Sequence, residues 1–461
     1  MIRKSTAELV LAYAVSTGGD FAELFLEDTR SGGISLVNGT IDNANTSRIH
    51  GAGIRIYHGL ESIYVHTNDT SEAGLVKAAK QAASAIGSGC GMRDITLTSG
   101  RCTNIHRIER MPMDISGSEQ AKLVHAAYDT AKSYDSSIIQ VSTGVTGTET
   151  DVTIANTEGL FISDTRVYTR FRVMAIAGDG KENQTGFQGP GAMMGYELFR
   201  DRVDVEAAAK DAARCAVTML HADNCPGGIM PVIIDNGFGG VIFHEACGHS
   251  LEATSVAFGN SELCGKMGQQ IGSKKLTAID DGTIPNNWGS ENIDDEGNPT
   301  TKLVLIENGI LKNYMVDRLN GRRMNMPVTG SGRRQSYAYA PTSRMRNTYI
   351  AAGDDDENEI ISSTAEGLYA KEMGGGSVNP LTGEFNFAVA EGYLIKNGKI
   401  DRPVRGATLI GKGGNTIMKI DRVGKKMWMA EGMCGSSSGS VPTRVGQPMI
   451  RVTDMTVGGR K

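Results

Sequence analysis

The segment MPVIIDNGFGGVIFHEACGH, residues 230–249, begins the second half of the chain. Residues 230–234 form an apolar run of strand length, and the glycines that follow favour a tight turn. Residues 244–249 then have the sequence HEACGH, which is typical of a helix that binds a metal ion. We therefore predict a strand, a turn and a metal-binding helix at the start of the C-terminal part.

The HEACGH segment combines the side chains that a hydrolytic zinc site requires. His244 and His249 offer two neutral imidazoles, and Glu245 places a carboxylate beside the first of them. Imidazoles bind Zn²⁺, and an open coordination position holds a water molecule whose pKa falls to about 7. A carboxylate can take the proton of that water and later deliver it to the leaving amine. The sequence thus predicts metal ligands at His244 and His249 and a general base at Glu245.

The spacing of the two histidines differs from that of the familiar metal-binding helix. Such helices place their histidines at i and i+4, whereas His244 and His249 are five residues apart. On a regular α-helix this spacing puts them about 140° apart around the axis. A one-residue π bulge would bring them together, or the helix could loosen at Gly248. We expect the distortion at Gly248.

A third protein ligand is needed to complete a catalytic zinc site. No histidine follows His249, so the ligand is an earlier histidine, a carboxylate or a thiolate. The candidates are Glu252, Cys264 and Cys434. Glu252 would lie near His249 on a continuing helix, where it could instead orient the imidazole. Cys434 lies in a glycine-rich turn, and its thiolate suits the softness of Zn²⁺. Spacing alone leaves the choice open.

The first 222 residues predict a domain of antiparallel strands and helices. Short alternating segments favour strands, and Asn38-Gly39 is typical of a hairpin turn. Longer periodic segments favour helices, and Ser5 or Thr6 should cap the first of them. The predicted strands are residues 22–27, 33–37, 41–45, 52–57, 61–66, 138–145, 152–156 and 168–177. The other predicted helices are residues 71–86, 116–133 and 204–219.

The sequence NCPGG at residues 224–228 is typical of a linker, so we predict two domains, residues 1–222 and 223–461. In the second domain strand–turn units recur, such as residues 303–306 followed by Asn308-Gly309, and little helix is expected after HEACGH. The predicted fold class is α+β. It consists of an N-terminal α/β domain and a C-terminal β-rich, barrel-like domain that carries the metal-binding helix.

Composition and charge exclude several classes of protein. The hydrophobic fraction of 39% and the charged fraction of 21% are those of a folded globular chain. The net charge is −5 without a block of basic residues, which argues against nucleic acid or a membrane as partner. No apolar run approaches the ~18 residues of a membrane span. Seven scattered cysteines favour a reducing compartment, so we expect a cytoplasmic protein. They are at positions 90, 102, 215, 225, 247, 264 and 434.

Seven motifs are spread over the chain. They are ISLVNG (34–39), GAGIR (51–55), HEACGHSLE (244–252), TAIDDGT (277–283), DDEG (294–297), RMRNT (344–348) and TVGG (456–459). In this combination the sequence resembles the TldD/PmbA family of metallopeptidases over nearly its whole length. The pattern HExxxH is that of the TldD branch, because the PmbA (TldE) branch lacks it.

The resemblance implies a role for each candidate residue. His244 and His249 would bind zinc, Cys434 would be the third ligand and Glu245 the catalytic base. It also implies an α/β N-terminal domain, a β-rich C-terminal domain, and a dimer with a like subunit or with a PmbA/TldE-type partner. Family members cleave unfolded peptides that lie extended in an enclosed chamber, in the manner of an added strand. We therefore expect a zinc-dependent peptidase that acts on unfolded or flexible polypeptides.

Three other functions are compatible with the sequence. A regulatory or binding protein with a structural zinc would need a closed site of four ligands, with Glu252 or Cys264 as the fourth. A metal-dependent amidase acting on a small molecule would need a narrow pocket. A cysteine peptidase with Cys434 as nucleophile would leave Glu245 and one histidine without a role. Because a structural site needs no base, Glu245 beside His244 favours the hydrolase.

Overall fold

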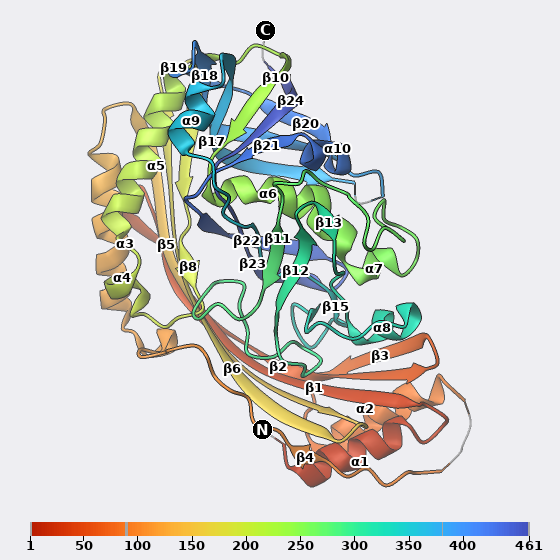
Figure 1. The fold of residues 1–461 in the computed structure, drawn as a ribbon. Helices are drawn as coiled ribbons and strands as arrows, with labels where there is room; N and C mark the ends of the chain where they lie inside the picture. The colour runs from red at the N-terminus through yellow and green to blue at the C-terminus, as the bar shows by residue number, and fades with distance from the viewer. Residues whose placement is uncertain (1, 88–90, 380, 460–461) are drawn as a thin grey trace.

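A computed structural model describes residues 2–87, 91–379 and 381–459. Its N-terminal part is an eight-stranded, mostly antiparallel sheet whose four longest strands curve around the C-terminal half (Figure 1). The order along the sheet is β3-β2-β1-β5-β6-β4, with β7 and β8 also pairing with β6. The strands are β1 (Phe21–Val37), β2 (Thr40–His58), β3 (Glu61–Thr67), β4 (Thr98–Ser99), β5 (Ile138–Asn156), β6 (Leu160–Gly178), β7 (Asn183–Gln188) and β8 (Gly191–Ala192).

These strands are longer than the sequence predicts. The expected segments 22–27 and 33–37 form the single strand β1, and residues 41–45 with 52–57, and 138–145 with 152–156, merge in the same way. The prediction was wrong because the polar and glycine-rich residues between the apolar segments stay paired with the neighbouring strands. At Gly33 a Cβ atom would lie 2.2 Å from the carbonyl oxygen of Val145, so glycine permits the close approach of β1 and β5.

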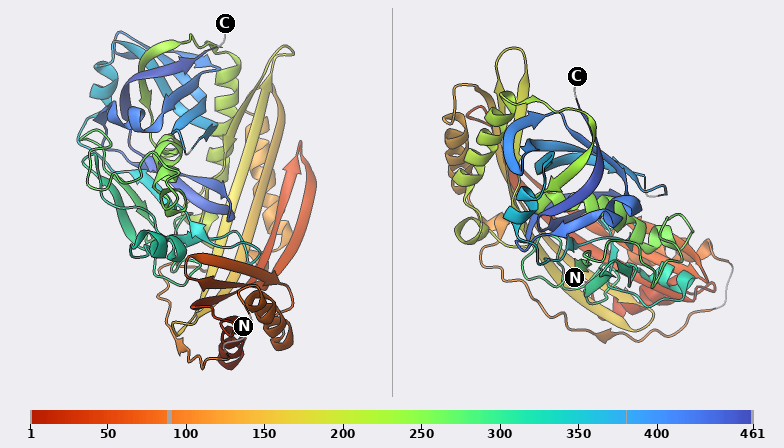
Figure 2. Two further views of the ribbon diagram at one scale, coloured as in Figure 1. Left: turned by 90° about the vertical axis from the view of Figure 1, so that its right-hand side faces the viewer. Right: turned by 45° about the horizontal axis from the view of Figure 1, so that its top comes forward.

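Helices cover the convex face of this sheet (Figures 1 and 2). At one end α1 (Lys4–Ala14) and α2 (Glu72–Ser84) pack on β1 and β2, and at the other end α3 (Gly117–Lys132) and α5 (Val205–Leu220) pack on β5 and β6. The buried helical surfaces are rich in alanine, which lets the helices lie close to the strands. None of the described helices is long and apolar enough to cross a membrane.

Local capping explains where most of these helices begin. The predicted helices 71–86, 116–133 and 204–219 are confirmed as α2, α3 and α5. The hydroxyl groups of Ser71 and Ser116 and the carboxylate of Asp204 accept backbone N–H groups of the first turns. The expected cap of α1 at Ser5 or Thr6 is wrong, because the helix begins at Lys4 and Arg3 holds the cap position without a side-chain bond.

The C-terminal half contains a barrel-like sheet. Strands β17-β10-β24-β20-β18 follow one another, and pairing of β18 with β17 closes the circuit. The α+β class and the barrel-like C-terminal half are thereby confirmed. The strands of this sheet are β9 (Asp223–Asn224), β10 (Gly228–Ile234), β17 (Glu366–Val378), β18 (Glu384–Lys396), β19 (Lys399–Arg405), β20 (Thr408–Lys412), β21 (Ile420–Val423) and β24 (Ile450–Gly458). The domain boundary between residues 222 and 223 stays a prediction.

A third sheet of six strands lies beside the barrel, in the order β13-β12-β11-β16-β23-β22. The predicted turn Asn308-Gly309 joins β12 to β13, with φ of 49° and 80°. The strands are β11 (Ala278–Asp281), β12 (Lys302–Glu307), β13 (Ile310–Leu311), β16 (Asn347–Ile350), β22 (Trp428–Ser436) and β23 (Gly439–Gln447); β14 (Gly332–Arg333) pairs separately with β15 (Thr342–Ser343).

Short helical segments connect the strands. They are η1 (Pro112–Asp114), α4 (Leu198–Asp201), η2 (Gly237–Gly240), α6 (Val241–Phe243), η3 (His244–Gly248), η4 (His249–Leu251), α7 (Ala253–Val256), α8 (Arg318–Met324), α9 (Glu357–Ser362) and α10 (Gly413–Met418). The segment from η2 to α7 passes through the largest apolar core, where it contacts residues of both the barrel and the third sheet. The HEACGH residues are therefore held from two sides.

Buried ion pairs join the long sheet to the C-terminal half. In each pair one partner comes from β1, β2 or β6 and the other from the loops between residues 290 and 335, and both side chains are almost fully buried. Such pairs require exact geometry because both charges lose their hydration. The pairs are Arg55–Glu296, Arg166–Asp295 and Arg334–Glu23, at 2.5, 2.6 and 2.6 Å.

Candidate metal centre

The HEACGH segment forms a π turn. After the single turn α6, residues His244–Gly248 are π-helical and His249–Leu251 continue as a 3₁₀ turn. The backbone N–H of His249 donates to the carbonyl of His244, the i+5 bond of a π helix. This widening brings the two imidazole rings to 5.1 Å between centroids, with their planes at 84°. Of the two distortions considered, the π bulge is the one that forms.

The expected loosening of the helix at Gly248 is wrong. Gly248 has helical dihedral angles, φ −55° and ψ −52°. Its lack of a side chain serves packing, because a Cβ atom would lie 2.2 Å from Sδ of the buried Met345. On another side of the turn, a Cβ atom on Gly413 would lie 1.9 Å from the carbonyl oxygen of Ala246. The π turn is therefore clamped between neighbours that approach it at backbone distance.

Cys434 on β22 completes a cluster with the two histidines. Its Sγ lies 3.5 Å from Nε2 of His249, and the ligand atoms of His244, His249 and Cys434 all lie within 4.8 Å of one another. Among the described residues no other group of three His, Cys, Asp or Glu side chains meets this condition. Nδ1 of His244 is buried without a hydrogen-bond partner within the described chain. Two imidazoles and one thiolate are a donor set that fits Zn²⁺.

The electrostatic surroundings favour the charged forms of this cluster. Burial opposes ionisation of Cys434, but the adjacent His244 and His249 outweigh it and lower the pKa of the thiol well below its ordinary value. Burial also opposes the charged form of His249, which lowers the pKa of the imidazole. The carboxylate of Glu252 and the Cys434 thiol outweigh burial and raise this pKa well above its ordinary value. These surroundings favour the thiolate form of Cys434, which is the form that binds a metal ion.

Glu245 is the most accessible acidic group at the cluster. Its side chain is 24% exposed, against 5% for Glu252. One carboxylate oxygen lies 3.6 Å from Nε2 of His249, the nitrogen that also faces Cys434. A carboxylate placed beside the point where the ligand atoms converge, and open to solvent, is positioned for proton transfer.

The other ligand candidates lie elsewhere. Oε2 of Glu252 is 3.1 Å from Nδ1 of His249, so this carboxylate contacts the far side of the ring. The thiol of Cys264 donates to the carbonyl of Val256 at 3.4 Å. Cys247 points into the apolar core, where burial raises its pKa. Cys90 lies outside the described residues. Neither Glu252 nor Cys264 therefore joins the cluster as a fourth donor.

Sequence reasoning assigned no role to Arg344, although it lies in the RMRNT motif. Its fully buried guanidinium donates to the carbonyl of Cys434 and lies 3.9 Å from Glu252. A single buried arginine in a polar loop produces no hydrophobic periodicity in the sequence. Its place in the RMRNT motif was therefore the signal that could have pointed to it.

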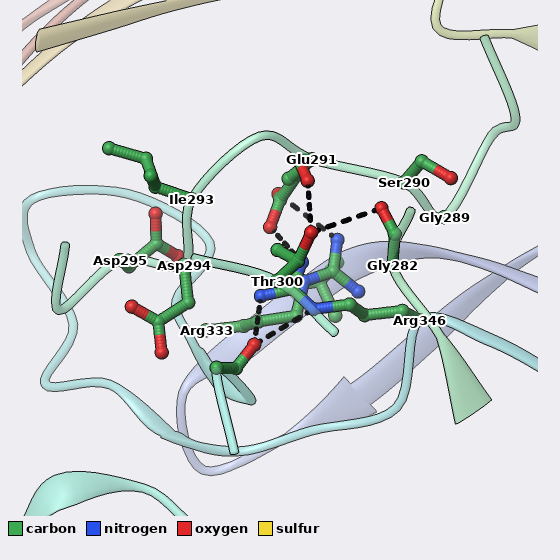
Figure 3. A network of polar contacts seen from close by, with 12 residues as sticks. Gly282, Gly289, Ser290, Glu291, Ile293, Asp294, Asp295, Thr300, Arg333 and Arg346 are labelled. Atoms are coloured by element: carbon green, nitrogen blue, oxygen red, sulfur yellow. Dashed lines mark hydrogen bonds and ion pairs between the residues drawn. The ribbon is translucent and has the colours of Figure 1, made fainter. Parts of the chain in front are cut away.

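A buried network of charges is centred on Glu291 (Figure 3). Glu291 pairs with Arg346 and, at 3.3 Å, with Arg333, while Arg166 of β6 lies 3.5 Å away. Burial raises the pKa of Glu291, but these three arginines hold it well below its ordinary value. Arg333 also donates to the carbonyl of Met345 at 2.7 Å. Within this network it is Arg333 that contacts the residue packed against the π turn.

A cleft of about 1150 Å³ runs along β22. Its lining includes the consecutive residues 428–433 of β22 and 372–375 of β17, together with Phe187 of β7. Within the described chain β22 pairs with β23 alone, so its other edge is free of strands. Trp428 and Met433 are 64% and 48% exposed. The lining ends at Met433, one residue before Cys434, and does not include His244, Glu245 or His249.

Comparison with known proteins places the chain. Family models match three successive parts: the PmbA/TldA metallopeptidase domain 1 at residues 22–86, the central domain at 112–220 and the C-terminal domain at 227–459. A metalloprotease TldD homolog from Buchnera aphidicola subsp. Acyrthosiphon pisum is 35% identical over 448 residues, which cover 95% of this chain and 93% of the relative. The chain belongs to the TldD/PmbA family.

Another relative and two solved structures agree with this placement. A zinc metalloprotease TldD homolog from Saccharolobus solfataricus is 33% identical over 267 residues, 58% of this chain and 59% of the relative. The solved structure of TldE from Thermococcus kodakarensis has a TM-score of 0.77 at 19% identity, covering 98% of this chain and all of that one. A Thermotoga maritima structure described as a candidate DNA gyrase modulator has a TM-score of 0.80 at 21% identity over 99% and 100% of the two chains. These two structures show a shared fold.

Proposed function

We propose that this chain is a zinc-dependent peptidase in which His244, His249 and Cys434 bind the metal and Glu245 is the general base. The observation that carries the proposal is the convergence of three ligand atoms within 4.8 Å beside a solvent-accessible carboxylate. Three protein ligands leave one position open, as in catalytic zinc sites. The family is one of metallopeptidases, and the S. solfataricus relative is named a zinc metalloprotease.

Each residue has a defined part in hydrolysis. When bound, a zinc ion would polarise the scissile carbonyl group and lower the pKa of a water molecule. Glu245 would take the proton of the attacking water and deliver it to the leaving amine. Glu252 would accept the Nδ1 proton of His249, which directs Nε2 of the ring toward Cys434.

The cleft supports an unfolded or flexible polypeptide as substrate. No strand of the described chain lies on the second edge of β22, so an extended peptide can lie beside it. The carbonyl groups of Glu431 and Gly432 already accept bonds from the side chains of Arg170 and Trp288, so the peptide would pair with the remaining backbone groups. The exposed rings and sulfur of Phe187, Trp428 and Met433 offer apolar surface to the peptide side chains. A cleft of about 1150 Å³ is larger than an amidase for a small molecule requires, and this disfavours that alternative.

We further propose that the chain works as a dimer in the cytoplasm. Its partner is a second copy or a TldE-type subunit, and the fold shared with the T. kodakarensis TldE makes such a subunit a suitable partner as well. Since the two chains have the same architecture, either can present an equivalent surface. The cysteines within the described chain are free, which suits a reducing compartment.

A cysteine peptidase is a second candidate, because Cys434, His249 and Glu252 form a connected chain. The contacts are 3.5 Å from Sγ to Nε2 and 3.1 Å from Nδ1 to the carboxylate, the order of a nucleophile, a base and an orienting acid. This assignment leaves His244 and Glu245 without a role. A closed structural zinc site is disfavoured because neither Glu252 nor Cys264 points into the cluster.

Zinc content and casein cleavage of the wild type, Glu245→Ala and Cys434→Ser test these assignments. We expect Glu245→Ala to retain zinc and to lose about 10²-fold or more in turnover. Cys434→Ser should lose both zinc and activity. Full cleavage by Glu245→Ala contradicts the mechanism, and unchanged zinc in Cys434→Ser contradicts the ligand set. Activity of metal-free protein that iodoacetamide abolishes would support the cysteine peptidase instead.

A further inference from the structure

Arg344 lies between the two segments that supply the proposed metal ligands. It belongs to the connection between β15 and β16, and its side chain is fully buried. Nη2 donates to the carbonyl of Cys434, and Nη1 donates to the carbonyl of Gly439 at 2.8 Å and to Oγ of Ser438 at 2.9 Å. These bonds connect Arg344 to both ends of the β22–β23 hairpin turn, which carries the Cys434 thiol.

The Nε atom of the same guanidinium faces Glu252. It lies 3.9 Å from Oε1 of Glu252, while Oε2 of that carboxylate lies 3.1 Å from Nδ1 of His249. Glu252 is 4% exposed, and its Oε1 has no hydrogen-bond partner within the described chain. A buried carboxylate needs positive charge nearby, and Arg344 supplies it.

Together the contacts form a closed ring of groups. The path leads from the carbonyl of Cys434 to Arg344, from there to Glu252 and on to His249, whose Nε2 is 3.5 Å from Sγ of Cys434. We propose that Arg344 is a positioning residue: it sets the separation of the Cys434 thiol and the His249 imidazole, so that both can bind one metal ion. This inference rests on the proposed metal site.

Arginine is suited to this position by its shape. The planar guanidinium carries five N–H donors in fixed directions, so it can bond the hairpin turn and face Glu252 at once. A lysine at position 344 would keep the charge but has one ammonium group on a flexible stem. It can therefore neutralise Glu252 or bond the turn, but it cannot fix the distance between them.

Arg346 provides a matched control. It follows Arg344 by two residues and is 1% exposed. Its guanidinium pairs with Glu291 and donates to the carbonyl of Gly330 at 2.7 Å, so it supports the fold without contact to the metal cluster. Loss of Arg346 should cost stability as loss of Arg344 does, while the geometry of the ligands stays unchanged.

The test compares the wild type with Arg344→Met, Arg344→Lys and Arg346→Met, each purified without metal. Titration with Co²⁺ gives a thiolate charge-transfer absorption that reports the bond from Cys434 to the metal. Competition with a chelator gives the Zn²⁺ affinity, and a thermal unfolding curve shows that each variant is folded. We expect Arg344→Met to weaken Zn²⁺ binding about 10–100-fold and to shift or diminish the absorption. Arg344→Lys should lie between it and the wild type.

The controls separate the possible failures. If Arg344→Met folds and shows the Zn²⁺ affinity and Co²⁺ absorption of the wild type, the inference is overturned. If Arg344→Met does not fold, wild-type affinity and absorption in Arg344→Lys overturn it. An equal loss of affinity in Arg346→Met also overturns it, because the effect would then be general. If the wild type itself binds Co²⁺ without thiolate absorption, the proposed metal site fails, and the role of Arg344 fails with it.

Discussion

Glu252 lies 3.1 Å from His249, with its Oε2 atom against Nδ1 of the ring. Nε2, on the other edge of the imidazole, is 3.5 Å from the thiol of Cys434. The carboxylate therefore determines which edge of the ring is offered to a metal ion. Glu252 follows His249 by three residues in sequence and lies at the end of the 3₁₀ turn, where the backbone becomes extended.

Replacement of Glu252 should weaken metal binding without removing a ligand. We predict that Glu252→Gln lowers Zn²⁺ affinity about 10–100-fold, because an amide orients the imidazole without the attraction of a charge. Chelator competition and kcat/KM on a fluorescent peptide measure the effect. Glu384→Gln, an exposed substitution on β18, serves as control. Equal Zn²⁺ affinity in Glu252→Gln and the wild type would refute the orienting role.

Two glycines at the π turn should differ in their tolerance of alanine. At Gly248 the added Cβ meets the thioether of Met345, which can adjust, so we predict a loss of about 1–3 kcal/mol in unfolding free energy. At Gly413 it meets the backbone carbonyl of Ala246 at 1.9 Å, so the loss should be larger. Urea unfolding measures both. The double variant Gly248→Ala, Met345→Ala should lose less unfolding free energy than the sum of the losses in the two single variants. If the losses simply add, the two residues are not in contact.

Stability should fall as Glu372 ionises. Burial, with Asp211 and Glu391 nearby, raises the pKa of Glu372 from 4.5 to about 7 in the folded chain. The folded state therefore holds the proton more tightly than the unfolded state. The contribution of Glu372 to the free energy of unfolding is thus fully present below pH 4.5 and is lost as pH rises through 7. We predict that Glu372→Gln matches the wild type at pH 5 and is more stable at pH 8. Equal unfolding free energies of the two proteins at pH 8 would exclude a raised pKa.

If zinc joins Cys434 to the two histidines, as proposed above, its removal should loosen the β22–β23 hairpin, because the hairpin would lose its link to the π turn. Free Zn²⁺ at 1,000 times its Kd would stabilise the folded state by about 4 kcal/mol. We therefore expect a chelator to lower the unfolding midpoint of the wild type and to raise amide exchange in residues 428–447. Cys434→Ser should show neither change. A chelator-induced shift of the same size in Cys434→Ser contradicts the assignment of this ligand.

Local features of the chain were predictable from the sequence alone. The caps at Ser71, Ser116 and Asp204 and the turns at Asn38 and Asn308 depend on bonds and dihedral angles within a few residues. The chemistry of HEACGH is local in the same sense, because two imidazoles and a carboxylate are present whatever the rest of the chain does.

Tertiary structure decided how those side chains are arranged. The π turn at His244–Gly248 is packed closely by Met345 and Gly413, which are distant from it in sequence, and no propensity within the six residues predicts a wider helix. The same holds for the long strands, whose polar middle sections are extended because their neighbours pair with them. The approach of Cys434 to His249 spans 185 residues of sequence and depends on the packing of β22 beside the turn. The sequence alone determined which donor groups are available, whereas the fold decided their separation, because contacts between distant segments set that distance.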